Sequence, residues 1–171
     1  MSLKSQLRRL ALVGALGVVA ATQASAHSII AVARTGNFTF GAAAPVMVPI
    51  AGAAVVTPLF ANPAGARFIV SYNAECAVAA AAGNFSTWMD VDVRAINAAT
   101  GAVFTLTPTA GGFDAFCTSN GTAANDGWQR VVVNAIGGPG MPAGNYRIQI
   151  RARLSGAGTG HLGDTSLIVS R

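Results

Sequence analysis

The sequence predicts an all-β protein: a two-sheet sandwich of jelly-roll or Ig-like Greek-key type, held by one disulfide and preceded by a cleaved signal peptide. Apolar and polar residues alternate with a period of two along several segments. Glycine- and proline-rich turns separate these segments at short intervals. The chain has two cysteines, and both lie downstream of an export signal.

The first 26 residues have the three parts of a secretory signal peptide. A basic start (MSLKSQLRR) precedes an apolar run (LALVGALGVVAA), and TQASA supplies the small residues Ala24 and Ala26 of a cleavage site. The apolar run is shorter than the roughly 20 residues that cross a bilayer. We expect cleavage after Ala26, a mature chain starting at His27, and a secreted or periplasmic location, with an uncleaved anchor as the alternative.

Residues 27–171 are expected to form a single β-sandwich domain, since this length is sufficient to bury a core. Cleavage removes Lys4, Arg8 and Arg9, so the net charge falls from +5 for the whole chain to +2, from eight arginines and six acidic residues. Nucleic-acid binding usually needs a clustered basic surface, which this charge does not indicate. We therefore expect no nucleic-acid partner.

The two cysteines, Cys76 and Cys117, are predicted to bond to each other. Exported proteins mature where thiols oxidise and disulfides persist. No CxxC motif or Cys/His cluster accompanies the two residues, so a structural metal site is not indicated.

An uncharged stretch, residues 41–61, has as many residues as a helix needs to cross a membrane. Pro45, Pro49 and Pro58 each remove a backbone donor and would break a helix there. We therefore predict two short strands, 46–50 and 53–60, and no integral membrane span after signal removal.

The clearest alternation lies in residues 145–154 and 88–96. The first segment places arginines on its polar face, and the second places Asp90 and Asp92 there. If the two strands are neighbours, cross-strand Asp–Arg pairs follow, each worth at most about 1 kcal/mol at an exposed site. Further strands are expected at 29–33, 37–40, 67–75, 102–107, 128–136 and 166–170, which gives about ten in all.

Residues 142–146 (PAGNY) place a glycine two positions before a tyrosine that opens a strand. This pattern resembles the tyrosine corner of Greek-key sandwiches, in which the tyrosine hydroxyl bonds to backbone just upstream. An ordinary edge tyrosine is the alternative for Tyr146.

His27 and His161, the two histidines, suggest one specific chemistry. An N-terminal histidine can bind Cu(II) through its α-amine and Nδ1, and a second imidazole completes the site. The arrangement resembles the histidine brace of lytic polysaccharide monooxygenases and of some periplasmic copper carriers, and it implies a copper site at His27 and His161. The alternative is an exposed terminal histidine and an unrelated loop histidine within GTGHLGD, with no cofactor at all.

Catalytic signals are weak. Asp90 and Asp92 share one strand face, where a pair of carboxylates could act in acid–base chemistry, but Arg94 beside them favours a solvated charged face. The sequence has no GxSxG or SxxK motif and no phosphate-binding glycine motif. The protein is therefore expected not to be an enzyme.

The aromatic residues Trp88, Trp128, Phe85, Phe113 and Phe116 flank the cysteine loops. Rim aromatics can stack on sugars or bury in a partner, although Trp88 and Trp128 at strand starts favour closure of the core.

NAECAV, the alanine-rich composition and the cysteine spacing resemble chaperone–usher pilins, whereas the late first cysteine and the ending SLIVSR depart from them. The sequence thus predicts an exported, non-catalytic module that binds a protein or glycan partner or builds an extracellular structure. A copper protein and a pilin-like fibre subunit are the alternatives. No oligomeric state is predicted.

Overall fold

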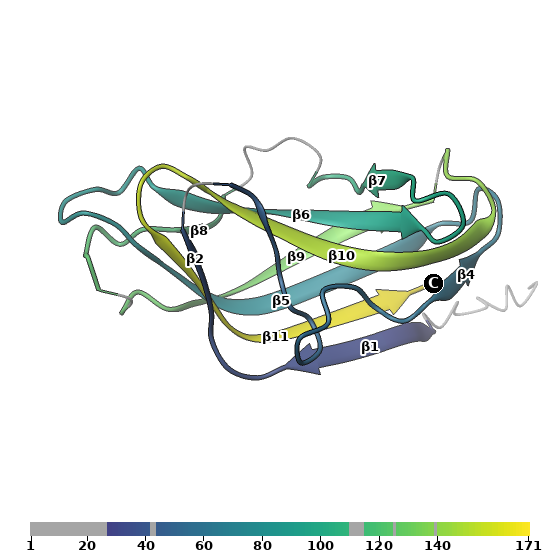
Figure 1. Cartoon of the computed structure of the whole chain (residues 1–171), viewed down its shortest axis with the longest axis horizontal. Helices are drawn as coiled ribbons and strands as arrows, with labels where there is room; N and C mark the ends of the chain where they lie inside the picture. The colour runs from purple at the N-terminus through teal and green to yellow at the C-terminus, as the bar shows by residue number, and fades with distance from the viewer. Residues whose placement is uncertain (1–26, 42–43, 110–114, 125, 139) are drawn as a thin grey trace, which may run out of the picture.

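The structure, a computed structural model, describes residues 27–41, 44–109, 115–124, 126–138 and 140–171 (Figure 1). The proposed signal peptide, residues 1–26, and Phe113 lie outside these ranges. The described residues contain strands and turns but no helix, and they form two antiparallel sheets. Accordingly, no helix in the described ranges has the length and apolar character needed to cross a membrane.

The first sheet, sheet A, has the strand order β1-β11-β5-β9, with β2 also paired to β11. β5 pairs with one side of β11 along nearly its whole length, so β1 and β2 follow one another along its other side. The strands of sheet A are β1 (Ser28–Arg34), β2 (Phe38–Gly41), β5 (Phe68–Ala79), β9 (Gln129–Gly137) and β11 (Thr159–Ser170).

The second sheet, sheet B, has the strand order β3-β10-β6-β7, with β4 also paired to β10 and β8 to β6. Its two long central strands, β6 and β10, are paired over ten residues. The strands of sheet B are β3 (Val46–Met47), β4 (Phe60–Asn62), β6 (Trp88–Asn97), β7 (Val103–Thr105), β8 (Ala115–Thr118) and β10 (Gly144–Ser155). The predicted all-β, two-sheet fold is confirmed.

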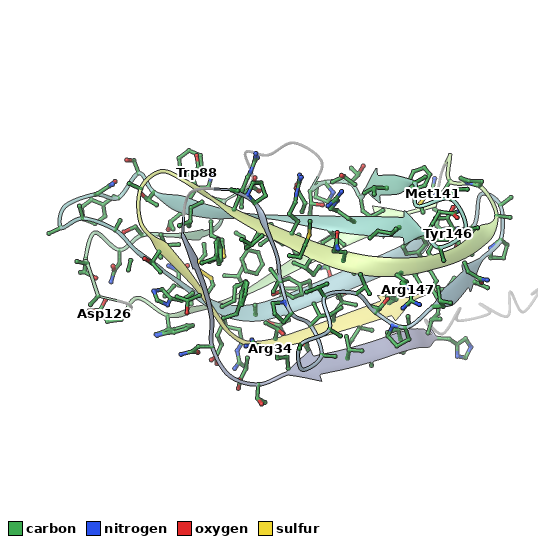
Figure 2. All side chains as sticks on the ribbon, viewed as in Figure 1. Arg34, Trp88, Asp126, Met141, Tyr146 and Arg147 are labelled. Carbon is green, nitrogen blue, oxygen red and sulfur yellow. A yellow bond between two sulfur atoms is a disulfide. The ribbon has the colours of Figure 1, made fainter. Side chains whose placement is uncertain are left out.

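The alternating apolar side chains of both sheets point inward and form one core between them (Figure 2). The largest fully buried members include Tyr72, Phe68 and Leu167 from sheet A and Tyr146, Ile148 and Ile150 from sheet B. Burial of each large apolar side chain contributes roughly 1.5–3 kcal/mol, so this core is the main source of stability.

The predicted disulfide is also confirmed. Cys76 lies in β5 of sheet A and Cys117 lies in β8 of sheet B, with their Cα atoms 6.3 Å apart. The bond therefore joins the two sheets through the core. Stable disulfides of this kind are typical of proteins that mature outside the reducing cytosol.

Tyr146 forms the predicted tyrosine corner at the end of the sandwich that also holds Met141 (Figure 2). Its ring is fully buried, and its hydroxyl donates a hydrogen bond to the carbonyl oxygen of Pro142 at 2.7 Å. The hydroxyl thus satisfies its hydrogen bonding while the ring fills the core.

The predicted strand at 53–60 is wrong, because only Phe60 belongs to a strand. The chain still follows the edge of β10 here through single bonds, from the Val48 amide to the Ile150 carbonyl and from the Thr57 amide to the Ile148 carbonyl, each 2.9 Å long. Proline has no amide to donate to a ladder, so Pro49 and Pro58 interrupt regular pairing.

The glycine-rich segment 156–163 is only partly a loop, because β11 already begins at Thr159. A side chain at Gly160 would place its Cβ 2.6 Å from Cζ of Phe40. The glycine is therefore required for close packing against β2, rather than for a turn. The short strand β8 is a further element that the alternating pattern does not predict.

Candidate functional site

The structure places the two histidines at opposite ends of β11. His161 lies near the start of this strand, whereas His27 exchanges backbone hydrogen bonds with Arg171, just past its end. Ten residues of extended chain span about 30 Å. The structure therefore does not bring the two imidazoles together within one chain. Within the described ranges, no group of three or more His, Cys, Asp or Glu side chains is positioned to hold a metal ion.

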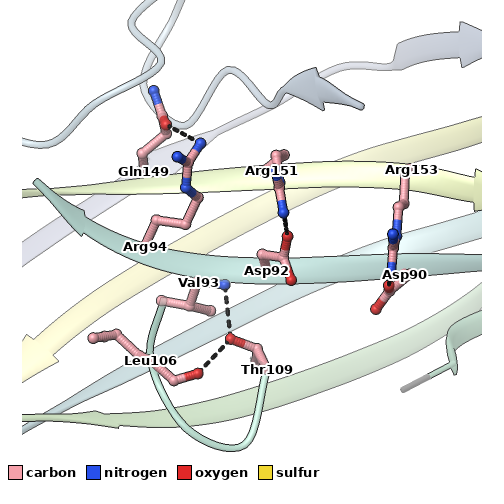
Figure 3. Close-up of polar contacts among 9 residues, drawn as sticks. All are labelled: Asp90, Asp92, Val93, Arg94, Leu106, Thr109, Gln149, Arg151 and Arg153. Carbon is pink, nitrogen blue, oxygen red and sulfur yellow. Dashed lines mark hydrogen bonds and ion pairs between the residues drawn. The ribbon is translucent and has the colours of Figure 1, made fainter. Parts of the chain in front are cut away.

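The acidic pair on β6 faces the arginines of β10, as expected for neighbouring strands (Figure 3). The guanidinium of Arg153 donates two hydrogen bonds to Oδ2 of Asp90, at 2.8 and 2.6 Å. Arg151 likewise donates from Nε to Oδ2 of Asp92, at 2.7 Å, and also from a terminal nitrogen. The predicted cross-strand Asp–Arg pairs are confirmed.

The expectation that this charged face is solvated holds for Arg151 and Arg153, whose side chains are 32% and 38% exposed, but is wrong for the two carboxylates. Asp90 is 2% exposed and Asp92 is 5% exposed. Long arginine side chains can cover neighbouring surface with their aliphatic stems while their charged ends pair with the carboxylates. Both carboxylates are therefore held in ion pairs on the sheet, and neither is presented as an open acid–base pair.

The rest of the outer face of sheet B is also polar and internally bonded. Arg94 donates to the side-chain oxygen of Gln149 at 3.2 Å (Figure 3), and Arg147 donates to the carbonyl oxygen of Thr57 at 3.2 Å. Val103 of β7 is 44% exposed. Sheet B therefore presents a largely charged outer face.

The outer face of sheet A mixes polar side chains with exposed apolar ones. Large apolar side chains are exposed on all four strands of its main path, although antiparallel sheets with one solvated face usually place polar residues there. The exposed set is Ile29 of β1, Ile168 of β11, Ile69 of β5, and Val132 and Ile136 of β9. Val132 is the most exposed of the five, at 53%. Exposed apolar side chains that gather into one patch can mark a region of interaction.

The strand β9 has an open backbone edge beside these exposed apolar side chains. The Ile136 amide donates to the carbonyl oxygen of Thr107, on the side away from β5, at 2.7 Å. Alternate residues of a strand direct their backbone groups to the same side. Val132 and Asn134 therefore direct theirs away from β5 too, and among the described residues nothing forms a backbone ladder with them.

The two sheets do not close over each other along β9. A crevice of about 360 Å³ lies between β7 and the end of β9, lined by Phe104, Leu106, Ile136 and Met141 among others. A smaller one, of about 110 Å³, lies between residues 131–133 of β9 on one side and Thr109, Ala115 and Phe116 on the other. Of the inward side chains of β9, Val131 and Val133 are consequently only half-buried, whereas Ala135 is fully buried. Within the described ranges, this side of the sandwich combines a backbone edge without a paired strand at Val132 and Asn134 with incompletely covered valine side chains.

Trp128, directly before β9, lies outside the core and is 38% exposed, so its interpretation as a core residue is wrong. Its ring lies against the imidazole of His161, with ring centroids 6.3 Å apart. A side chain at Gly163 would place its Cβ 3.2 Å from the tryptophan ring and from Glu75. The ring thus rests on β11, beside the 2.6 Å ion pair between Glu75 and Arg130.

Burial lowers the pKa of His161 below its ordinary value. Of the other predicted rim aromatics, Phe116 is buried, Phe85 is 68% exposed, and Trp88 is partly buried. The structure therefore brings Trp128 and His161 together on sheet A and leaves Trp88 on sheet B.

Fold and site together define a disulfide-bonded β-sandwich with a charged outer face and a mixed polar and apolar face that ends in an open strand. No family model and no curated protein matches the chain. Solved structures that resemble it include the D431N mutant VP2 protein of infectious bursal disease virus in T=1 particles, with TM-score 0.44 and 9% identity. Another is the Gt strain of infectious bursal disease virus, with TM-score 0.42 and 10% identity. Each match covers 86% of this chain but only 36% of the viral chain. Neither similarity bears on function.

Proposed function

We propose that this protein is a secreted or periplasmic, non-catalytic structural module that assembles with other chains by accepting an extra strand at the open edge of β9. The observation that carries the proposal is the direction of the Val132 and Asn134 backbone groups, which point away from β5 to a side without a paired strand in the described ranges. An exposed strand edge is a ready template for pairing with another chain.

The side chains around this edge favour association. Natural edge strands are usually protected by charges or proline. β9 has no proline, and its one charged residue, Arg130, is engaged by Glu75 at 2.6 Å. Val132 and Ile136 add apolar surface at the same edge. The engagement of Asp90 and Asp92 in ion pairs further supports a non-catalytic role.

Export is supported by the basic, apolar and small-residue order of residues 1–26 and by the disulfide between the sheets. Both fit a module that works outside the cytosol.

The substitution Val132→Lys tests this function. We expect the mature protein to form assemblies that grow with concentration, and the lysine to weaken this association by roughly tenfold or more, because a charge at the edge disfavours strand addition. Val103→Lys is the matched control, since Val103 is an exposed valine on β7 of the other sheet. Sedimentation velocity across a concentration series measures the effect. A wild-type protein that stays monomeric throughout, or equal loss in both variants, would contradict the proposal.

Glycan binding is the second candidate, and the position of Trp128 favours it. A partly exposed ring held flat on a sheet beside a carboxylate and a guanidinium can stack on a sugar ring while its neighbours bond to hydroxyls. We expect chitohexaose or alginate oligosaccharide to shift the tryptophan fluorescence of the wild type and of Trp88→Phe, but not that of Trp128→Phe. Titrations without any shift in the wild type would exclude both classes of sugar as ligands.

A further inference from the structure

Sheet A has a second open edge, at β1. The backbones of His27 and Arg171 exchange two hydrogen bonds, at 3.0 and 3.1 Å, so the amide and carbonyl of Arg171 point toward β1. Because alternate residues of a strand direct their backbone groups to the same side, those of Val169 and Leu167 point toward β1 as well. Their partners Ile30 and Val32 point back toward β11. Ala31 and Ala33 therefore direct their amides and carbonyls outward. As at β9, no described strand pairs with that side.

The edge of β1 carries little that would repel another strand. Residues 28–33 have no charge, and β1 ends in a single arginine. The guanidinium of Arg34 folds back on its own turn, where it donates to the carbonyl oxygens of Gly36 at 2.7 Å and Asn37 at 2.9 Å. The charges that usually guard a strand edge are therefore absent from residues 28–33.

The directions of the strands make these two edges complementary. Every step along β1-β11-β5-β9 is antiparallel, so β1 and β9 run in opposite directions. A second copy placed beside the first in the same orientation brings its β1 against β9 as an antiparallel strand. The antiparallel alternation of sheet A then continues across the contact at Val132 and Asn134, and it stops at Ile136, whose amide is already bonded to Thr107.

The register through the sheet specifies which residues meet. Ala33 aligns with Val132 through Ser166 and Asn73. Ala31 aligns in the same way with Asn134, through Ile168 and Ser71. With no stagger between copies, Ala33 of the second copy lies opposite Val132. Both residues direct their backbone groups into the contact, and small alanine side chains face the valine and the asparagine.

Resting on the proposed function, we infer that the strand accepted by β9 is β1 of a second copy of this chain. Each copy keeps one open edge after joining, so the contact repeats and the product is an open head-to-tail filament rather than a closed dimer. The exposed isoleucines of β1, β11 and β5 then lie on the same face as Val132 and Ile136 of the next copy.

Cysteine pairing between single variants tests this arrangement. The variants Ala33→Cys and Val132→Cys are purified with the native disulfide intact, mixed and oxidised. Cα atoms of a hydrogen-bonded antiparallel pair lie about 5.5 Å apart, within the range that a disulfide spans. We expect a covalent dimer only in the mixture, and a ladder of multimers from the double variant, on non-reducing gels.

Other outcomes separate the inference from the function on which it rests. If Val132→Cys dimerises alone, the contact is a two-fold pairing of β9 with β9, and the head-to-tail arrangement is overturned while strand addition at β9 stands. The head-to-tail arrangement is likewise overturned if no pair crosslinks although Val132→Lys still abolishes assembly. A wild-type protein that stays monomeric would contradict both the head-to-tail arrangement and the proposed strand addition at β9.

Capping supplies an independent measurement that needs no new cysteine. Val132→Lys keeps its β1 edge, so it can join the end of a growing filament but cannot extend it. Small amounts added to the wild type are expected to shorten the assemblies seen by sedimentation, whereas Val103→Lys is not. A Val132→Lys protein that leaves the wild-type distribution unchanged would overturn head-to-tail growth.

Discussion

Replacing Cys76 and Cys117 together by alanine is expected to lower the free energy of unfolding by about 4 kcal/mol. The two residues are 41 positions apart and join β5 to β8. Without the bond, the unfolded chain regains the freedom of this long loop, which favours unfolding. Urea unfolding followed by intrinsic fluorescence measures the change.

Reduction provides the matched comparison for this prediction. Wild-type protein unfolded in the presence of dithiothreitol is expected to show nearly the same midpoint as the double alanine variant, because both lack the crosslink and differ only in two buried sulfur atoms. A variant as stable as the oxidised wild type would show that the core alone holds the sheets together.

The second large effect is expected at Asp92. Asp92→Ala removes the partner of Arg151 within sheet B, and we expect a loss of about 3 kcal/mol, because breaking a buried ion pair leaves a charge without its counter-ion. The side chain of Asp92 is 7% exposed and that of Arg151 is 32% exposed, which places the cost toward the low end of the range for fully buried pairs. Chemical denaturation again measures the loss.

A double-mutant cycle isolates the interaction. Asp92→Ala combined with Arg151→Ala is expected to cost less than the sum of the two single changes, since the second change removes the charge that the first leaves behind. Glu75→Ala is the control, because its pair with Arg130 is exposed on both sides and is worth less than about 1 kcal/mol. Equal costs at Asp92 and Glu75 would contradict the role assigned to burial.

Local patterns account for what the sequence predicts well. The period-two alternation identifies β6 and β10, and their opposite charges indicate that they could be neighbours. The disulfide follows from a count of two cysteines in an exported chain, and the tyrosine corner from five consecutive residues. Each of these inferences depends on residues that are near in sequence or, for the disulfide, on a cysteine that has one possible partner in the chain.

The remaining features depend on tertiary packing. The burial of Asp90 and Asp92 is a property of the folded sheet rather than of the alternating pattern on β6. The open edge of β9 follows from strand order, which alternation does not specify. Trp128 directly precedes β9 and Trp88 opens β6, yet Trp128 lies exposed beside sheet A while Trp88 is partly buried. Composition contains no signal for that difference.

The position of the sulfur bridge has a mechanical consequence. Tension applied across sheet A, from β9 to β1, passes through backbone ladders on β5 and β11. Because Cys76 lies on β5, the bridge couples that tension covalently to sheet B. Sheet B resists sliding against sheet A as long as the bridge is intact, and a reduced molecule would yield by shear between its two layers.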